Sequence, residues 1–141
     1  RQSGQYGMVV PRFVQWALKN EPIHVYGDGQ QQRCFCNVQD VVKAIHALAE
    51  SEAAVGQLFN IGNNDEISIL DLAKRIRERV NSTSEIVLIP YEDAYEIGFE
   101  DFRRRVPSIE KLQSCINWQP QTSLDTTIDQ VIAYQRAAVN S

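Results

Sequence analysis

Residues 23–38 read Ile-His-Val-Tyr-Gly-Asp-Gly-Gln-Gln-Gln-Arg-Cys-Phe-Cys-Asn-Val, and the rest of the chain can be arranged around this stretch. Apolar and polar side chains alternate on both sides of a glycine-containing turn, a pattern typical of two short β-strands. We predict a strand over Ile23–Tyr26, a turn at Gly27-Asp28-Gly29 and a second strand over Arg33–Val38, paired as a hairpin. Arg33 opens the second strand in this prediction.

Helical periodicity dominates the remainder of the chain. Apolar residues recur every three or four positions in several segments, and residues suited to capping stand at some of their starts. The predicted helices cover Met8–Leu18, Asp40–Glu50 with Asp40 as the cap, Ser68–Val80, Ser108–Cys115 and a last segment that starts at Ser123. We predict further strands over Leu58–Gly62, as a buried strand, and over Glu85–Ile89, and we assign Tyr91–Val106 to an ordered loop.

Length and composition restrict the class of protein. A chain of 141 residues with 43% hydrophobic content can form one globular domain without disulfides or metals. The net charge is −4, so no global positive field attracts nucleic acid or an anionic membrane. No apolar run approaches the roughly 20 residues of a membrane span. The number of cysteines is three, which is odd and favours reduced thiols and a cytoplasmic protein. The sequence begins with a polar segment that has no initiator Met, which suggests a truncated sequence.

The predicted glycine turn carries residues that suit a nucleotide diphosphate. Arg33 offers a planar fork for phosphate oxygens, the glycines let the backbone approach a ligand, and the ring of Tyr26 can cover a base. The alternative is structural, with Tyr26 as a half-buried strand residue and Arg33 as a surface charge. The residue types alone leave both interpretations open.

The run Arg103-Arg104-Arg105 is a second candidate for anion binding. Successive side chains of an extended segment diverge, so at most one or two of the three can share a site. Nearby acidic residues, including Glu92 and Asp101, offer ordinary ion pairing as the alternative.

No metal site is predicted. His24 and His46 lie on different elements without cysteine or acidic residues at ligand spacing, and both are interpreted as structural. Cys34 and Cys36 flank Phe35 without a second cysteine pair, which favours packing in a small core.

Taken together, the motifs resemble the NAD-dependent epimerase/dehydratase family of extended short-chain dehydrogenases/reductases. The similar segments are Val10-Pro11-Arg12-Phe13, Val25-Tyr26-Gly27-Asp28-Gly29, Arg33-Cys34-Phe35, Val38 with Asp40, Phe59-Asn60-Ile61-Gly62, Arg105-Val106-Pro107-Ser108 and Asn117-Trp118-Gln119-Pro120. They cover essentially the whole chain in the order and spacing of the family. Ser108, where relatives often have Asp, and Asn37, where they often have His or Tyr, depart from its pattern.

The resemblance implies a substrate site. It implies that Arg33 and Arg105 pair with the diphosphate of a UDP- or dTDP-linked sugar from two sides, with Arg104 as the alternate. It also places Tyr26 near the nucleobase, and Val10 and Phe13 on a helix whose start lines the same pocket. No catalytic, cofactor-binding or metal-binding residue is assigned to this chain.

The resemblance further implies an α/β fold in which residues 1–141 are a mixed α+β fragment, the C-terminal nucleotide-sugar-binding domain of an extended Rossmann-type protein. Residues from about 37 to 80 would pack back on the dinucleotide-binding core. The sequence has no Gly-x-x-Gly-x-x-Gly loop for a pyrophosphate and no Tyr-x-x-x-Lys pair for proton transfer. We therefore expect NAD to bind the full-length protein, a homodimer, and this chain alone to be inactive.

Three functions stay open at this point. The leading one is part of a UDP-glucose 4-epimerase-like enzyme. The second keeps the fold but changes the reaction, as in UDP-glucuronate decarboxylases or dTDP-glucose dehydratases. The third is a stand-alone, non-catalytic nucleotide-sugar-binding or assembly module.

Overall fold

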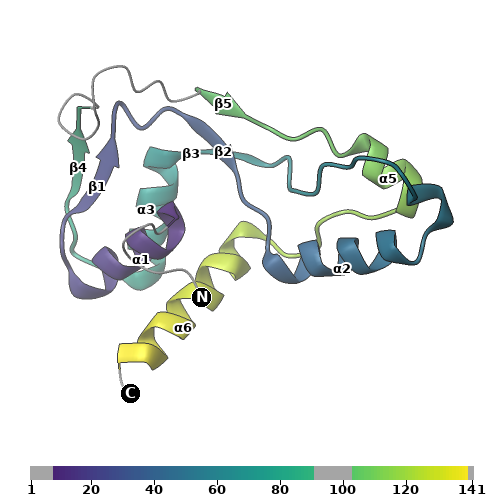
Figure 1. The fold of residues 1–141 in the computed structure, drawn as a ribbon. Helices are drawn as coiled ribbons and strands as arrows, with labels where there is room; N and C mark the ends of the chain where they lie inside the picture. The colour runs from purple at the N-terminus through teal and green to yellow at the C-terminus, as the bar shows by residue number, and fades with distance from the viewer. Residues whose placement is uncertain (1–7, 91–102, 140–141) are drawn as a thin grey trace.

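The computed structural model of the chain describes residues 8–90 and 103–139. In chain order its elements are α1 (Val9–Lys19), β1 (Ile23–Tyr26), β2 (Gln32–Cys34), α2 (Val38–Ala49), η1 (Glu52–Ala54), β3 (Glu66–Ser68), α3 (Ile69–Val80), β4 (Ile86–Ile89), β5 (Arg104–Arg105), α5 (Glu110–Ile116) and α6 (Leu124–Val139). Figure 1 shows two lobes, one with α1, α3, β1 and β4 and the other with α2 and α5. The predicted mixed α/β class is confirmed.

The main hydrophobic core lies where α1, α3 and α6 pack together against β1. Helix α1 has the predicted amphipathic pattern, and its buried residues Val10, Phe13, Val14 and Ala17 recur at helical spacing on one face. Ile23 and Val25 of β1 are fully buried against this face, as are Leu72 and Ile76 of α3 and Ile128 of α6. Burial of these side chains fixes the positions of α1 and β1, which carry part of the site described below.

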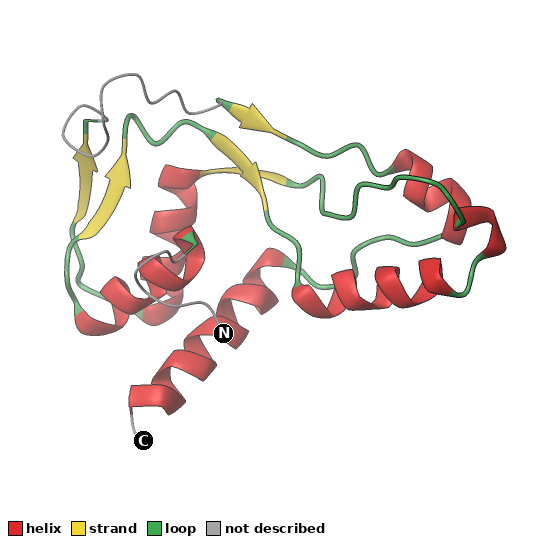
Figure 2. Cartoon of the chain, in the orientation of Figure 1, coloured by secondary structure: helices red, strands yellow, loops and turns green. Residues whose placement is uncertain are grey.

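The strands form two small sheets; in Figure 2 the pair β1 and β4 stands at the left, and β2, β3 and β5 lie at the top. Strands β1 and β4 pair in parallel, with Ile23 opposite Ile86. Strand β2 is the centre of the second sheet, antiparallel to β3 and parallel to β5. Strand β3 leads directly into α3. Ser68 is the last residue of the strand, and its hydroxyl caps the helix by accepting a hydrogen bond from Asp71 N.

The predicted hairpin between residues 23–26 and 33–38 is wrong. Both strands exist, but β1 and β2 belong to different sheets and do not pair. The connecting loop is held by the start of α3 instead, because Leu70 N donates to the carbonyl of Gly29 and Ile69 N donates to the carbonyl of Gln31. These bonds replace the cross-strand ladder that a hairpin requires.

Two other strand predictions also differ from the structure. The second strand ends at Cys34, because Asn37 caps the following helix and the chain leaves the sheet before it. Residues Leu58–Gly62, predicted as a buried strand, form no strand, and Leu58 is 83% exposed. No strand among the described residues pairs with this segment, so its amide and carbonyl groups lack the ladder partners of a buried strand.

The start of α2 is capped by Asn37 and not, as predicted, by Asp40. The side chain of Asn37 accepts a hydrogen bond from Gln39 N, and its amide donates to Thr127 and Gln130 of α6. Asp40 lies in the first turn of the helix and accepts hydrogen bonds from Gln121 N and Thr122 N. Both side chains therefore tie the second lobe to the beginning of α6.

The remaining predictions can be compared only in part. The helices predicted over 8–18, 68–80 and 108–115 and from 123 onward correspond to α1, α3, α5 and α6 within a few residues, and β4 corresponds to the strand predicted over 85–89. The predicted loop Tyr91–Val106 lies largely outside the described residues, and its described end contains β5. None of the helices in the described ranges is long and apolar enough to cross a membrane.

Candidate functional site

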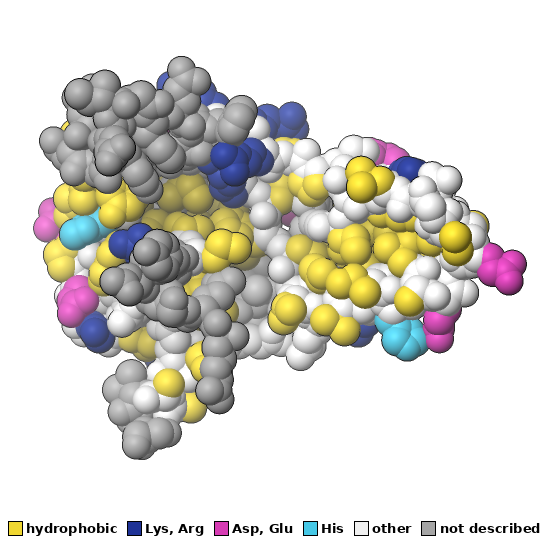
Figure 3. All heavy atoms as spheres, viewed as in Figure 1, with side chains coloured by type: hydrophobic (Ala, Val, Ile, Leu, Met, Phe, Trp, Pro, Cys, Tyr) yellow, Lys and Arg dark blue, Asp and Glu magenta, His cyan; other side chains and the backbone are white. Residues whose placement is uncertain are grey.

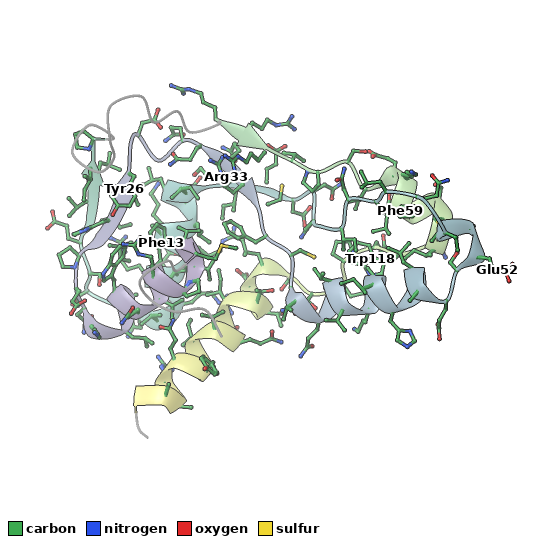
Figure 4. The ribbon with its side chains drawn as sticks, in the orientation of Figure 1. Phe13, Tyr26, Arg33, Glu52, Phe59 and Trp118 are labelled. Carbon is green, nitrogen blue, oxygen red and sulfur yellow. The ribbon has the colours of Figure 1, made fainter. Side chains whose placement is uncertain are left out.

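A cavity of about 950 Å³ opens in the lobe that contains the main core. Its wall combines side chains from α1, β1, β2 and α6 with Arg105 of β5. Five of the six residues predicted to bind substrate line it: Val10, Phe13, Tyr26, Arg33 and Arg105. Figure 4 shows Phe13, Tyr26 and Arg33 gathered in this lobe, whereas Phe59 and Trp118 lie in the other one.

The charge of this cavity is opposite in sign to that of the whole chain. Among its described lining residues, Arg12, Arg33 and Arg105 are cationic and none is Asp or Glu. The chain as a whole has a net charge of −4. A wall with three guanidinium groups and no carboxylate favours an anionic ligand through local electrostatics.

Arg33 and Arg105 are brought together by the pairing of β2 and β5. They are partners in this parallel ladder, so their side chains project from the same face of the sheet. The pairing is supported at the start of the ladder, where Gln32 N donates to the carbonyl of Arg103 at 2.7 Å. Two guanidinium groups on one sheet face can hold a diphosphate from two sides, since each offers a planar fork of donors.

Arg104 is the one predicted site residue that the structure does not bring to the cavity. It lies on the opposite face of β5, where its guanidinium forms a two-pronged ion pair with Glu66 of β3 at 2.8 and 2.6 Å. Hydrogen bonding to Arg104 holds the pKa of Glu66 below its ordinary value. Arg103 approaches Asp28 at 3.6 Å. The three adjacent arginines therefore diverge, as predicted, and only Arg105 faces the cavity.

Tyr26 ends β1 and lines the same cavity as this arginine pair. Its backbone carbonyl accepts a hydrogen bond from Nε2 of Gln31, which also lines the cavity. The bond fixes the strand end relative to the segment that leads into Arg33. Tyr26 and Arg33 thus line one cavity although their strands belong to different sheets.

Several cavity residues were not predicted to belong to a site, and one of them, His24, was interpreted as structural. Trp16 and His24 line it from α1 and β1, and Thr127, Gln130 and Tyr134 line it from α6. The three α6 residues recur at helical spacing, which puts them on one side of the helix, and α6 packs against α1. This spacing is the only feature of the sequence that could have indicated them. Figure 3 shows apolar side chains within the hollow of this lobe and basic side chains at its edge.

The cysteines of the cavity are not activated nucleophiles. Burial raises the pKa of Cys34, and Glu66 and Asp65 raise it further. Burial also raises the pKa of Cys36, with Asp40 as the second cause. Both thiols are therefore protonated near neutral pH, and all three cysteines are free.

Two kinds of ligand-binding feature, a cluster of metal-ligating side chains and a dinucleotide-binding glycine turn, are not found among the described residues. It contains no group of three or more His, Cys, Asp or Glu side chains that could hold a metal ion. Its glycines with positive φ are Gly27, Gly29 and Gly56, and none of them opens an α-helix. The glycine turn at a helix N-terminus that seats the pyrophosphate of a dinucleotide is thus absent from these residues.

Comparison with known proteins extends these observations. The family model described as GDP-mannose 4,6 dehydratase matches residues 2–131. A UDP-N-acetyl-alpha-D-glucosaminuronate decarboxylase of Bacillus cytotoxicus is 38% identical over 139 residues, which are 99% of this chain and 43% of that protein.

Two solved structures resemble the fold closely. A UDP-glucose 4-epimerase with UDP-glucose from Thermotoga maritima is 28% identical with a TM-score of 0.83, over 95% of this chain and 41% of that one. MoeE5 in complex with UDP-glucuronic acid and NAD is 25% identical with a TM-score of 0.80, over 93% of this chain and 42% of that one. The chain thus spans less than half the length of these proteins. It belongs to the NAD-dependent epimerase/dehydratase family, in which it matches the model of GDP-mannose 4,6 dehydratase and corresponds to the C-terminal portion of the extended short-chain dehydrogenase/reductase fold.

Proposed function

We propose that this chain is the nucleotide-diphosphate-sugar-binding portion of a larger NAD-dependent enzyme. The observation that carries the proposal is the pairing of Arg33 and Arg105 on one sheet face, in a cavity whose described lining residues include no carboxylate. A diphosphate placed between the two guanidinium groups receives charge-assisted hydrogen bonds from both strands. The nucleotide sugars bound in the similar structures, UDP-glucose and UDP-glucuronic acid, contain such a diphosphate.

In this proposal the arginine pair positions substrate and does not perform the chemistry. Holding the diphosphate on two strands fixes the sugar relative to the reacting groups, which lowers the entropic cost of the reaction. Proton transfer and the binding of NAD are assigned to parts of the full-length protein outside these residues. The absence of a Tyr-x-x-x-Lys pair and of a dinucleotide-binding glycine loop from the sequence supports this division.

The reaction has two candidates. A UDP-glucose 4-epimerase-like reaction is the leading one, and the similarity to the Thermotoga maritima epimerase supports it. Decarboxylation of a UDP-linked uronic acid is the second, favoured by 38% identity to a decarboxylase over nearly the whole chain. Turnover of the full-length protein with UDP-glucose and with UDP-glucuronic acid, followed by product analysis, separates them. A parallel assay with dTDP-glucose tests the third reaction, dehydration of a dTDP-linked sugar.

Residues from about 37 to 80, which include α2 of the second lobe, are proposed to pack on the cofactor-binding core of the full-length protein. Three large apolar residues of α2, Val38, Val42 and Ile45, are more than half exposed, and Val55 and Leu58 are more exposed still. In Figure 3 apolar side chains form a broad surface on this lobe. A surface of this kind is typical of a protein interface and not of free solvent.

Introducing a charge tests this packing. We expect Val42→Lys to destabilise the full-length protein, because a cation would be buried in an apolar interface. Gln39→Lys, a change at an exposed polar position of the same helix, serves as the control. Equal thermal stability of the two variants would contradict the packing.

We also propose that the full-length protein is a homodimer, and sedimentation of that protein tests this proposal. We propose a cytoplasmic location as well, which the free thiols support.

Calorimetric titration with UDP tests the binding site itself. We expect UDP to bind the full-length protein saturably, and Arg33→Ala and Arg105→Ala each to weaken binding by about 1.5–3 kcal/mol, the usual contribution of a charge-assisted hydrogen bond. Arg104→Ala is the matched control, because this neighbouring arginine faces away from the cavity. Unchanged UDP affinity in both cavity variants would refute the arginine pair. A full-length protein that binds UDP-sugars but converts none of them would favour the stand-alone binding module.

A further inference from the structure

Three polar side chains join the start of α2 to α6 and line the cavity there. The side-chain nitrogen Nδ2 of Asn37 donates to Thr127 Oγ1 at 3.1 Å and to Gln130 Oε1 at 2.8 Å. All three residues line the cavity. Asn37 is only 3% exposed, so these bonds, and not contacts with solvent, determine how its side chain is oriented.

The orientation of the Gln130 amide follows from this network by elimination. The backbone N–H of Gln39 can only donate, so the Asn37 atom 2.9 Å from it is Oδ1. The Asn37 atom that faces α6 is then Nδ2, which also can only donate. The hydroxyl of Thr127 donates to the carbonyl of Ser123, and its oxygen accepts from Asn37. The Gln130 atom that meets Nδ2 is therefore Oε1, and Nε2 is turned away from Asn37.

Nε2 of Gln130 is left as a donor at the cavity. Gln130 is exposed and lines the cavity, and its Nε2 donates to no other residue that the structure describes. Gln135 of the same helix differs in this respect, because it also lines the cavity but its Nε2 donates to the carbonyl of Pro11 at 2.9 Å. An amide NH2 group can only donate, so the group that fits Gln130 is an acceptor oxygen of a ligand.

This junction lies where the proposed function requires the sugar to be. Gln31, which holds the carbonyl of Tyr26, directly precedes β2, whereas Asn37 follows β2. Figure 1 shows β1 and α2 on opposite sides of β2. The reaction takes place on the sugar, so the sugar faces the cofactor-binding core, and that core is proposed to pack on α2. With the diphosphate at Arg33 and Arg105, the sugar therefore extends toward the start of α2.

We propose that Gln130 is a specificity-determining residue, whose Nε2 donates a hydrogen bond to an oxygen of the sugar, and that Asn37 is the positioning residue that fixes this orientation. This inference rests on the proposed function, because it gives the sugar a contact in the cavity whose arginines hold the diphosphate. The accepting oxygen is a hydroxyl or the carboxylate of a uronic acid, and the bond is stronger when it is a carboxylate.

Titrations of the full-length protein with UDP and with UDP-sugars test the role of Gln130. The ratio of the UDP-sugar affinity to the UDP affinity of the same variant isolates the sugar contact, because a change in diphosphate binding affects both ligands. We expect Gln130→Met, which keeps the length of the side chain but not the donor, to lower this ratio. The expected loss is roughly 2- to 10-fold for a hydroxyl and roughly 10- to 100-fold for a carboxylate.

UDP-glucose and UDP-glucuronic acid distinguish the two acceptors. A lower ratio with both ligands indicates a hydroxyl that they share, and a lower ratio with UDP-glucuronic acid alone indicates its carboxylate. Gln135→Met is the matched control and should leave the ratio unchanged, because the donor of Gln135 is already bonded to Pro11.

A second substitution separates positioning from a purely structural role. Asn37→Leu is similar in shape but neither donates nor accepts, so the amide of Gln130 loses its fixed orientation. We expect Asn37→Leu to lower the ratio in the wild-type background and to lower it no further when it is added to Gln130→Met. A second loss in the double variant would show that Asn37 acts by another route and would overturn its positioning role. The UDP affinity of each variant shows whether the arginine site is intact.

An unchanged ratio in Gln130→Met, with UDP binding that still depends on Arg33, would overturn this inference and leave the proposed function standing. A ratio that falls equally in Gln130→Met and Gln135→Met would also overturn it, because the loss would not depend on the unused donor. If the wild-type protein does not bind UDP, the proposed function itself fails.

Discussion

Arg33 and Arg105, 72 positions apart in the sequence, are direct partners in the parallel ladder between β2 and β5. Like charges directly opposite each other in a sheet are destabilising, and an anion between them removes this repulsion. In the proposed function a diphosphate lies between the two guanidinium groups, and we therefore expect the two arginines to act as a unit in binding.

A double-mutant cycle measures this coupling. We expect the combined Arg33→Ala and Arg105→Ala variant to lose less UDP affinity than the sum of the single losses, by about 0.5–3 kcal/mol, because either loss already misplaces the diphosphate for the other arginine. Calorimetric titration of the four proteins provides the cycle. Strict additivity would show that the two side chains act on separate ligand groups or at separate places.

Arg104 should behave differently from Arg105. Its ion pair with Glu66 is exposed to solvent, with 67% of the Arg104 side chain accessible, so screening by water and salt reduces its contribution. We expect Glu66→Gln and Arg104→Ala to leave UDP affinity and the urea midpoint of unfolding nearly unchanged at physiological salt. A loss of UDP binding comparable to that of Arg105→Ala would mean that Arg104 reaches the ligand after all.

The helices were predictable because each presents a long apolar stripe. The segments that become α1 and α3 repeat apolar residues over about three turns, a signal that local sequence carries. β3 and β5 have only three and two residues, too short for an alternating pattern to be recognised. Their pairing with β2 depends on contacts between distant segments, which periodicity does not contain.

The candidate site shows the same division. The resemblance brought Arg33, Arg105 and Tyr26 to one site, and the structure places all three around one cavity. The contact between Trp16 and His24 had no local signal, because the two rings come from different elements. The cap of α2 was misassigned for a similar reason. Asn37 and Asp40 are both good capping residues, and the distant amides of residues 121 and 122 determine which role Asp40 has.

Asp40 should make the stability of the protein depend on pH. Burial of this carboxylate, which is 1% exposed, raises its pKa, but hydrogen bonds from Thr122 and Gln121, together with Lys43, outweigh burial and hold the pKa below its ordinary value of 3.8. A lowered pKa in the folded state means that the carboxylate stabilises the fold at neutral pH. This contribution is lost as the pH falls below about 3.8 and through the folded-state pKa.

Asp40→Asn tests this dependence. We expect the variant to lose about 1–3 kcal/mol of unfolding free energy at pH 7, because charge-assisted hydrogen bonds become neutral ones. The difference from wild type should shrink as the pH is lowered below 3.8, because the unfolded wild-type chain then binds a proton that the folded carboxylate resists. Urea unfolding at several pH values provides the comparison, and a difference that does not change with pH would contradict the assigned role.

Two glycines with the same backbone conformation should tolerate alanine very differently. Gly29 and Gly56 both have φ of 70°, a left-handed conformation that costs an alanine about 1–2 kcal/mol. A Cβ on Gly29 would lie 2.9 Å from side-chain atoms of both Leu70 and Val25, whereas a Cβ on Gly56 would meet nothing within 4 Å. Gly56→Ala should therefore cost only the conformational term. Gly29→Ala should cost about 1–3 kcal/mol more, because one of the packed neighbours must move.

The same comparison reaches the cavity. The carbonyl of Gly29 accepts the hydrogen bond from Leu70 N that holds the loop between Tyr26 and Arg33 against α3. Displacing this loop shifts both cavity residues, so we expect Gly29→Ala to weaken UDP binding and Gly56→Ala to leave it unchanged. Urea unfolding and UDP titration of the two variants measure both effects. Equal stability losses would show that the close approach of Gly29 to Leu70 and Val25 relaxes without cost, and that the loop does not depend on glycine for its packing.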